Sequence, residues 1–198
     1  MPSHHRSTVS ARVTSSARAT GHTRGVRLLR LLQATRGPDP RPGRPALAAA
    51  GESVILFGPV GVGKTHIAQA LGHMAIRQGA DVRFAKTSRV LAELAGGHAD
   101  RTWDKRLHEL VRFDVLILND FAMRQLNATQ ADDLYELVSA RQGKSLIITS
   151  NRSPSDWYPL FPNPVVAESL LDRVINTSHQ VIMNGPSYRP NKRPRNGS

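Results

Sequence analysis

The residues with the clearest capacity for chemistry form one loop at residues 58–65 of the chain. Its sequence is Gly58-Pro59-Val60-Gly61-Val62-Gly63-Lys64-Thr65, which matches the pattern G-x-x-x-x-G-K-[ST]. The glycines allow such a loop to wrap a phosphate chain with its backbone N–H groups pointing inward. Lys64 can reach the β- and γ-phosphates, and the Thr65 hydroxyl can bind Mg²⁺. We therefore expect a nucleoside triphosphate to bind along all of these residues, with Lys64 also serving catalysis.

A second candidate group lies at the end of an apolar strand. The segment Asp114-Val115-Leu116-Ile117-Leu118-Asn119-Asp120 resembles the strand whose terminal acid holds Mg²⁺ in P-loop proteins. Asn119 stands where the first of two acids is expected. Its amide oxygen can accept a hydrogen bond but carries no charge. We expect Thr65, Asn119 and Asp120 to face the bound Mg²⁺, and we call this part of the site its metal side. Either Asp120 covers both acidic roles, or hydrolysis is weakened.

Asn151 is the third candidate, because it follows the apolar segment 145–149. A polar residue at this strand end can lie between the phosphate loop and the acidic strand and orient an attacking water. The alternative is a simple turn residue before Arg152-Ser153-Pro154. Guanine specificity is disfavoured, since the nearest approach to N-K-x-D is Asn191-Lys192-Arg193-Pro194, which lacks the acid.

Apolar strands and amphipathic helices alternate around these candidates. Strands are predicted at 54–57, 81–85, 114–120 and 145–149, and helices at 66–76, 88–95, 103–111 and 128–141. The pair Gly96-Gly97 is expected to end the second helix. Strands that are nearly all apolar indicate a parallel sheet covered on both faces. The predicted fold is an α/β P-loop NTPase.

The charge of the chain is concentrated at its two ends. The 198 residues carry a formal charge of +12, with 27 basic and 15 acidic side chains, and 39% of the residues are hydrophobic. Residues 1–46 hold nine arginines and one acid, and residues 184–198 hold four basic residues and no acid. Residues 47–183 are neutral, with 14 of each sign. We expect an ATPase domain over 47–183 and two basic tails that are disordered.

Composition also excludes several classes of protein. The chain has no cysteine, which excludes a disulfide framework, a thiolate zinc site and a cysteine nucleophile. It has neither an apolar run of about 20 residues nor the hydrophobic core of a signal peptide. We expect a cytoplasmic protein without membrane association. The Arg-rich segment 1–46 allows three interpretations: an arm that binds nucleic acid, a mitochondrial presequence, or an unstructured tail.

Several blocks together resemble the IstB-like helper ATPases of bacterial transposons, which are AAA+ proteins related to the DnaC helicase loaders. The similarity extends from about Gly51 to Arg195. Besides the phosphate loop and the acidic strand, it is carried by Ala131–Leu137, Ile147–Trp157, Ser169–Val174 and Ser187–Arg189.

This resemblance implies an ATPase that uses ATP and Mg²⁺, assembles as a homo-oligomer on duplex DNA without sequence preference, and delivers target DNA to a transposase. It also implies that Arg173 is a finger that reaches a neighbouring subunit's nucleotide and that Arg189 is a phosphate sensor. An intramolecular ion pair, for example with Glu168, is the alternative for Arg173. Alternatives for the whole chain are a DnaC-like helicase loader and a nucleotide-dependent DNA-binding module with little or no hydrolysis. A small-molecule kinase is disfavoured, since no lid or substrate motif is evident.

Three features depart from the family pattern. Asn119 replaces the first acid, and Ala122 stands where a glycine usually follows the aromatic residue. Residues 1–50 do not resemble the longer, helical N-terminal region of the family, and the change at Leu47–Glu52 is abrupt. This join suggests a frame change or a mis-assigned start. Translation of the upstream DNA in the other two frames tests that hypothesis, and finding no family-like helical sequence there would contradict it.

Overall fold

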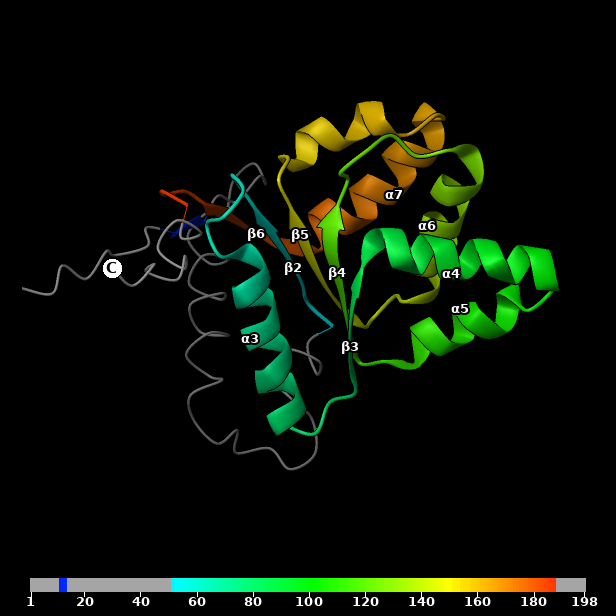
Figure 1. The fold of residues 1–198 in the computed structure, drawn as a ribbon, viewed down its shortest axis with the longest axis horizontal. Helices are drawn as coiled ribbons and strands as arrows, with labels where there is room; N and C mark the ends of the chain where they lie inside the picture. The colour runs from blue at the N-terminus through cyan, green and yellow to red at the C-terminus, as the bar shows by residue number, and fades with distance from the viewer. Residues whose placement is uncertain (1–10, 14–50, 188–198) are drawn as a thin grey trace, which may run out of the picture.

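The computed structural model describes residues 11–13 and 51–187, which form a six-stranded sheet in the order β1-β6-β2-β5-β4-β3 (Figure 1). Five strands are parallel, and β1 lies antiparallel along the edge of β6. The strands are β1 (Ala11–Val13), β2 (Ser53–Phe57), β3 (Val82–Lys86), β4 (Val115–Phe121), β5 (Ser145–Ser150) and β6 (Ser178–Met183). Each of the four predicted strands is present with its ends shifted by one residue at most.

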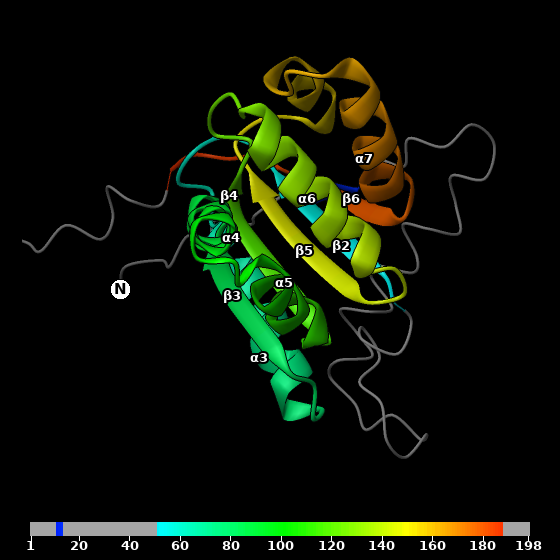
Figure 2. The ribbon, with the colours of Figure 1, turned by 90° about the vertical axis from the view of Figure 1, so that its right-hand side faces the viewer.

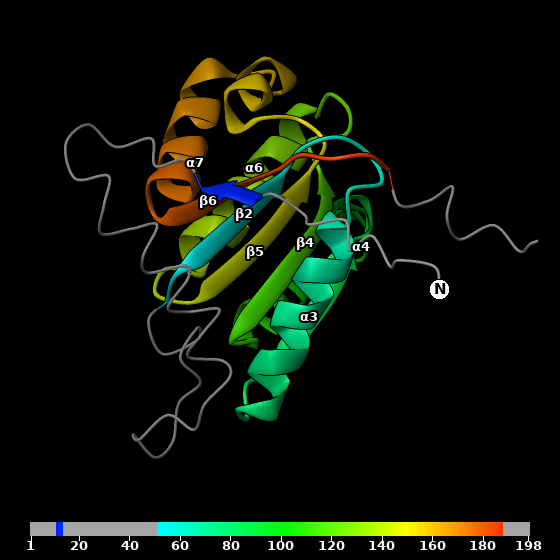
Figure 3. The ribbon, with the colours of Figure 1, turned by 90° about the vertical axis from the view of Figure 1, so that its left-hand side faces the viewer.

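Helices cover both faces of the sheet, as Figures 2 and 3 show from opposite sides. One face carries α3 (Lys64–Arg77), and side chains of β2 such as Val54 and Leu56 pack beneath it. The other face is covered by α4 (Thr87–Asp100), α5 (Trp103–Arg112), α6 (Ala128–Ala140), α7 (Pro164–Asn176) and the 3₁₀ helix η1 (Pro154–Leu160). The central strands β2, β4 and β5 are buried on both sides, whereas β3 at the edge is only partly buried. This parallel sheet with helices on both faces confirms the predicted α/β P-loop fold.

The prediction that Gly96-Gly97 ends a helix is wrong. Helix α4 continues through both glycines to Asp100, and Arg101 then takes a left-handed conformation with a φ of 61°. A Cβ atom on Gly97 would lie 2.7 Å from the Cα of Trp103, at the start of α5. Gly97 is therefore suited to the close approach of two helix backbones, which outweighs its poor helix propensity.

The strand β6 was not predicted, because its first half is polar. His179 and Gln180 are buried within it, and the His179 Nε2 atom lies 2.8 Å from Glu52 Oε2. The strand exists because its backbone pairs with β2 over five residues. Partners from elsewhere in the chain thus replace the apolar run that normally identifies a buried strand.

The structure describes only a small part of the two basic tails that were predicted to be disordered. Within the segment 1–46, Ala11–Val13 pair with β6 as the strand β1. Residues 184–187 continue from β6. Residues 1–10, 14–50 and 188–198 lie outside the described residues. In the part of the chain that the structure describes, no helix has the length and apolar character needed to cross a membrane.

The glycine pair in α4 provides a test of this packing. We expect Gly97→Ala to lower the free energy of unfolding by about 1–2 kcal/mol, because overpacking against α5 exceeds the gain in helix propensity. Gly96→Ala is the matched control, since its Cβ would meet only the flexible end of Arg106. Urea unfolding of both variants measures the difference. Equal stability of the two would contradict this account of α4 and α5.

Candidate nucleotide-binding site

The phosphate loop connects the carboxyl end of β2 to the first turn of α3. Gly58, Gly61 and Gly63 have φ angles of 144°, 89° and 93°, which side chains disfavour. Lys64 begins α3 and is 7% exposed. Its Nζ donates hydrogen bonds to the carbonyl oxygens of Gly58 at 2.7 Å and Pro59 at 2.6 Å. The ammonium group is thus held inside the loop by two of its own carbonyl oxygens.

The N-terminus of α3 adds to the anion-binding character of this loop. Gly63 occupies the capping position, and among the described residues no side chain caps the helix and no acid lies in its first turn. The first N–H groups of a helix have no partner within the helix, and the helix dipole gives them partial positive charge. Together with Lys64, they form a cradle whose chemistry suits a phosphate chain.

Asn119 is in contact with the phosphate-loop helix. It is 4% exposed at the end of β4, and its Oδ1 accepts a hydrogen bond from the Thr65 hydroxyl at 2.9 Å. A second hydroxyl, that of Thr149 on β5, donates to the same oxygen at 2.8 Å. The structure therefore joins the loop and the acidic strand at Thr65 and Asn119, two of the three residues that were predicted to lie on the metal side.

The chain after Asn119 makes a strained turn. Asp120 and Ala122 have φ angles of 59° and 58°, a conformation that costs about 1–2 kcal/mol for a residue with a Cβ. Between them, Phe121 is 3% exposed and packs edge-on against the fully buried Trp157. The positive φ explains why a glycine suits position 122. Asp120 itself is partly buried.

Asn151 follows β5, which lies between the strand of the phosphate loop and the acidic strand. The position is the one predicted, and its Nδ2 contacts the sulfur of Met123 at 3.3 Å. The preceding Ser150 hydroxyl donates to the Phe121 carbonyl at 2.9 Å and accepts from the Trp157 indole at 3.2 Å. Sequence reasoning missed this serine, although its position directly before Asn151 was a usable signal.

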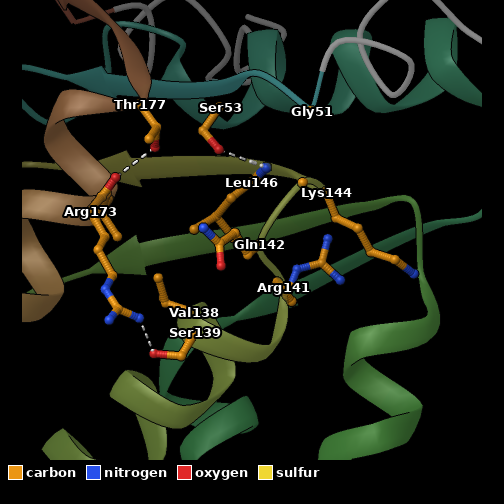
Figure 4. A pocket seen from close by; sticks show the side chains of 12 residues that line it. Gly51, Ser53, Val138, Ser139, Arg141, Gln142, Lys144, Leu146, Arg173 and Thr177 are labelled. Carbon is orange, nitrogen blue, oxygen red and sulfur yellow. Dashed lines mark hydrogen bonds between the residues drawn. The ribbon is translucent and has the colours of Figure 1, made fainter.

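Arg173 lies at the opposite end of the sheet from the phosphate loop, in a pocket of about 250 Å³ (Figure 4). Its Nη1 donates to the Ser139 hydroxyl at 2.7 Å, and the guanidinium lies 5.3 Å from the Tyr135 ring. The alternative of an ion pair with Glu168 is wrong, because no carboxylate of residues 51–187 pairs with this exposed cation. Arg173 is not brought together with Lys64.

The same pocket contains a second arginine with a structural role. Arg141 is buried and donates to the carbonyl oxygens of Leu110, Phe113 and Ser145 at 2.8–2.9 Å. Burial lowers the pKa of Arg141 to about 10, against the opposing charge of Asp114. The group stays protonated at neutral pH and stabilises the C-terminal end of α5, where free carbonyls attract a cation.

Arg189 lies outside the described residues, but the chain that leads to it passes the phosphate loop. A Cβ atom on Gly61 would lie 2.0 Å from the hydroxyl oxygen of Ser187. Gly61 therefore needs the absence of a side chain for two reasons, its backbone angle and this close approach.

A comparison with protein families decides where the chain belongs. Residues 46–196 match the family described as IstB-like ATP binding protein. The chain belongs to this IstB-like family. A Mycobacterium tuberculosis protein named for ATP binding in an insertion sequence is 71% identical over 73% of this chain and 59% of its own length. A Pseudomonas aeruginosa protein named for ATP binding in the insertion sequence IS21 is 37% identical over 70% of this chain and 52% of its own length.

The IstB-like chain thus spans between half and three fifths of these two relatives. Among solved structures, the DnaC helicase loader has a TM-score of 0.66 at 19% identity, over 85% of this chain and 94% of that one. The replication initiator DnaA, bound to AMPPCP and single-stranded DNA, has a TM-score of 0.63 at 16% identity, over 84% of this chain and 48% of that one. At such identities the likeness shows the fold alone.

Proposed function

We propose that this IstB-like chain binds ATP with Mg²⁺ and acts as a DNA-associated helper of an insertion-sequence transposase. One observation carries the nucleotide site. The Lys64 ammonium lies within a glycine loop, and the next residue, Thr65, is hydrogen-bonded to the end of the acidic strand. The names of the relatives support the link to transposition.

Each part of the site has a chemical role in this proposal. The loop N–H groups and Lys64 bind the phosphates, and the oxygens of Thr65, Asn119 and Asp120 form the kind of ligand set that suits Mg²⁺. Bound Mg²⁺ would neutralise part of the phosphate charge. Asn151 orients a water for attack on the terminal phosphate, and Arg189 senses the phosphates. The partly buried contact between Thr65 and Asn119 supports this ligand set, because two of the proposed ligand oxygens lie 2.9 Å apart.

A helicase loader is the main alternative, and the sequence comparisons do not favour it. The likeness to DnaC is at 19% identity, whereas the relatives at 71% and 37% identity are named for insertion sequences. A DNA-binding module that hydrolyses little ATP would bind the nucleotide in the same loop. Only a measurement of ATP turnover therefore distinguishes it from the proposed helper.

The deciding experiment measures ATP hydrolysis with and without duplex DNA at low and moderate salt. Hydrolysis stimulated by DNA supports the helper function. ATP-dependent DNA binding without turnover would favour the non-hydrolysing module, and phosphoryl transfer to a small acceptor would favour a kinase.

Lys64→Ala tests the nucleotide site directly. We expect tight ATP binding to be lost, because the substitution removes the buried cation that reaches the terminal phosphates. Equilibrium binding of a fluorescent ATP analogue measures the effect. Lys105→Ala, which removes an exposed lysine of α5, is the control and should bind as the wild type does. Unchanged affinity of Lys64→Ala would overturn the site.

DNA binding should be largely independent of sequence and weaken steeply as salt rises, because neutralised phosphates release counterions. Lys192, Arg193 and Arg195 are the first candidate contacts, and the N-terminal arginines are the second. We expect deletion of residues 190–198 to weaken binding uniformly and to reduce the salt slope by about 3. Fluorescence anisotropy with unrelated duplexes measures both. An unchanged slope would place the contacts on other parts of the chain.

Arg173 should act between subunits, since its own phosphate loop is at the other end of the sheet. A cation near a neighbour's terminal phosphate stabilises charge that develops in the transfer. We expect Arg173→Ala and Lys64→Ala each to lose ATPase activity and their mixture to recover part of it. Mixing Arg77→Ala, which removes an exposed arginine of α3, with Lys64→Ala is the control. No recovery at any ratio for the Arg173 mixture would refute a trans-acting role.

A further inference from the structure

Asn119 is held by three threonines that come from three different elements. Thr65 of α3 and Thr149 of β5 donate to its side-chain oxygen at 2.9 Å and 2.8 Å. Thr87 of α4 donates to its backbone carbonyl at 3.1 Å. The Thr87 hydrogen bond is to the backbone of Asn119, so the two others determine the orientation of its side-chain amide group.

The hydroxyls of Thr149 and Thr65 differ in how freely they can reorient. The Thr149 oxygen accepts a hydrogen bond from the Asp120 backbone N–H at 3.1 Å, and the residue is 1% exposed. Its single proton is directed at Asn119 and meets an acceptor there. Thr65 lies at the start of the phosphate-loop helix, and its hydroxyl would turn toward Mg²⁺ when the metal is present. Thr149 therefore remains the donor that distinguishes the oxygen of the amide from its NH₂ group.

We propose that Thr149 is a positioning residue that presents the Asn119 carbonyl oxygen, rather than its NH₂ group, to the metal side of the nucleotide site. The inference rests on the proposed binding of ATP with Mg²⁺. An amide has one end that accepts and one that only donates, so an Asn at this position suits a cation only when it is held in one orientation. A carboxylate has two equivalent oxygens and needs no such control.

The test compares nucleotide affinity in Mg²⁺ with affinity in EDTA for the full chain, using a fluorescent ATP analogue. We expect Thr149→Val to reduce the affinity gained from Mg²⁺ by about tenfold, which corresponds to about 1.4 kcal/mol for one buried hydrogen bond. Thr149→Ser keeps the hydroxyl and should retain the gain. Thr149→Ala carries the same expectation as Thr149→Val and replaces it if that variant does not fold.

Ser53→Ala is the matched structural control. Its buried hydroxyl accepts from the Leu146 N–H on β5 at 3.1 Å, at the end of the sheet away from the phosphate loop. This variant also loses one buried hydrogen bond to the backbone, but its gain from Mg²⁺ should equal that of the wild type. Thermal unfolding of all variants separates a general loss of stability from a change at the metal side.

A double-mutant cycle with Asn119→Asp completes the test. We expect Asn119→Asp to bind nucleotide more tightly in Mg²⁺, because it adds a full negative charge among the oxygen ligands. In that background, Thr149→Val should cost about threefold or less, since either carboxylate oxygen can serve. Equal losses in both backgrounds, or no loss in either, would overturn the role of Thr149. Absence of nucleotide binding by the wild type would instead overturn the proposed function and this inference with it.

Discussion

The candidate site depends on the position of β5 between β2 and β4. Because these strands are parallel, their carboxyl ends meet at one edge of the sheet, and Ser150 is in register with both Phe57 and Phe121. The phosphate loop follows Phe57, the strained turn surrounds Phe121, and Asn151 follows Ser150. Backbone pairing alone therefore brings together segments that are separated by more than 90 residues.

Hydroxyl groups at this edge complete what the backbone begins. Thr149 and Ser150 are adjacent on β5, so their side chains point to opposite faces of the sheet. One hydroxyl contacts Asn119 and the Asp120 N–H, and the other contacts the Phe121 carbonyl and the Trp157 indole. Each satisfies buried polar groups that would otherwise cost about 1–3 kcal/mol. The left-handed turn at Asp120 and Ala122 is held between these two sets of contacts.

The two ends of the sheet have different chemistry. The edge with the phosphate loop combines a buried ammonium, helix N–H groups and the side-chain oxygens of Thr65 and Asn119. The other end carries Arg173 against Tyr135 and Ser139. The five residues of β2 separate the two ends by about 16 Å at 3.3 Å per residue. An exposed guanidinium with neutral partners at that distance is suited to an anion on another molecule rather than to the nucleotide of its own chain.

The local sequence by itself determined the apolar strands, most of the helices and the phosphate loop, because these follow from hydrophobic period and from glycine spacing. The tertiary structure decided what depends on distant partners. Helix α4 continues through Gly97, because the backbone of Trp103 packs there. The strand β6 forms around the buried His179, whose side chain is paired with Glu52. The tertiary structure also decided that Asn119 faces Thr65 and Thr149. The direction of a buried amide is set by hydrogen bonds that cross between elements, and no local pattern contains them.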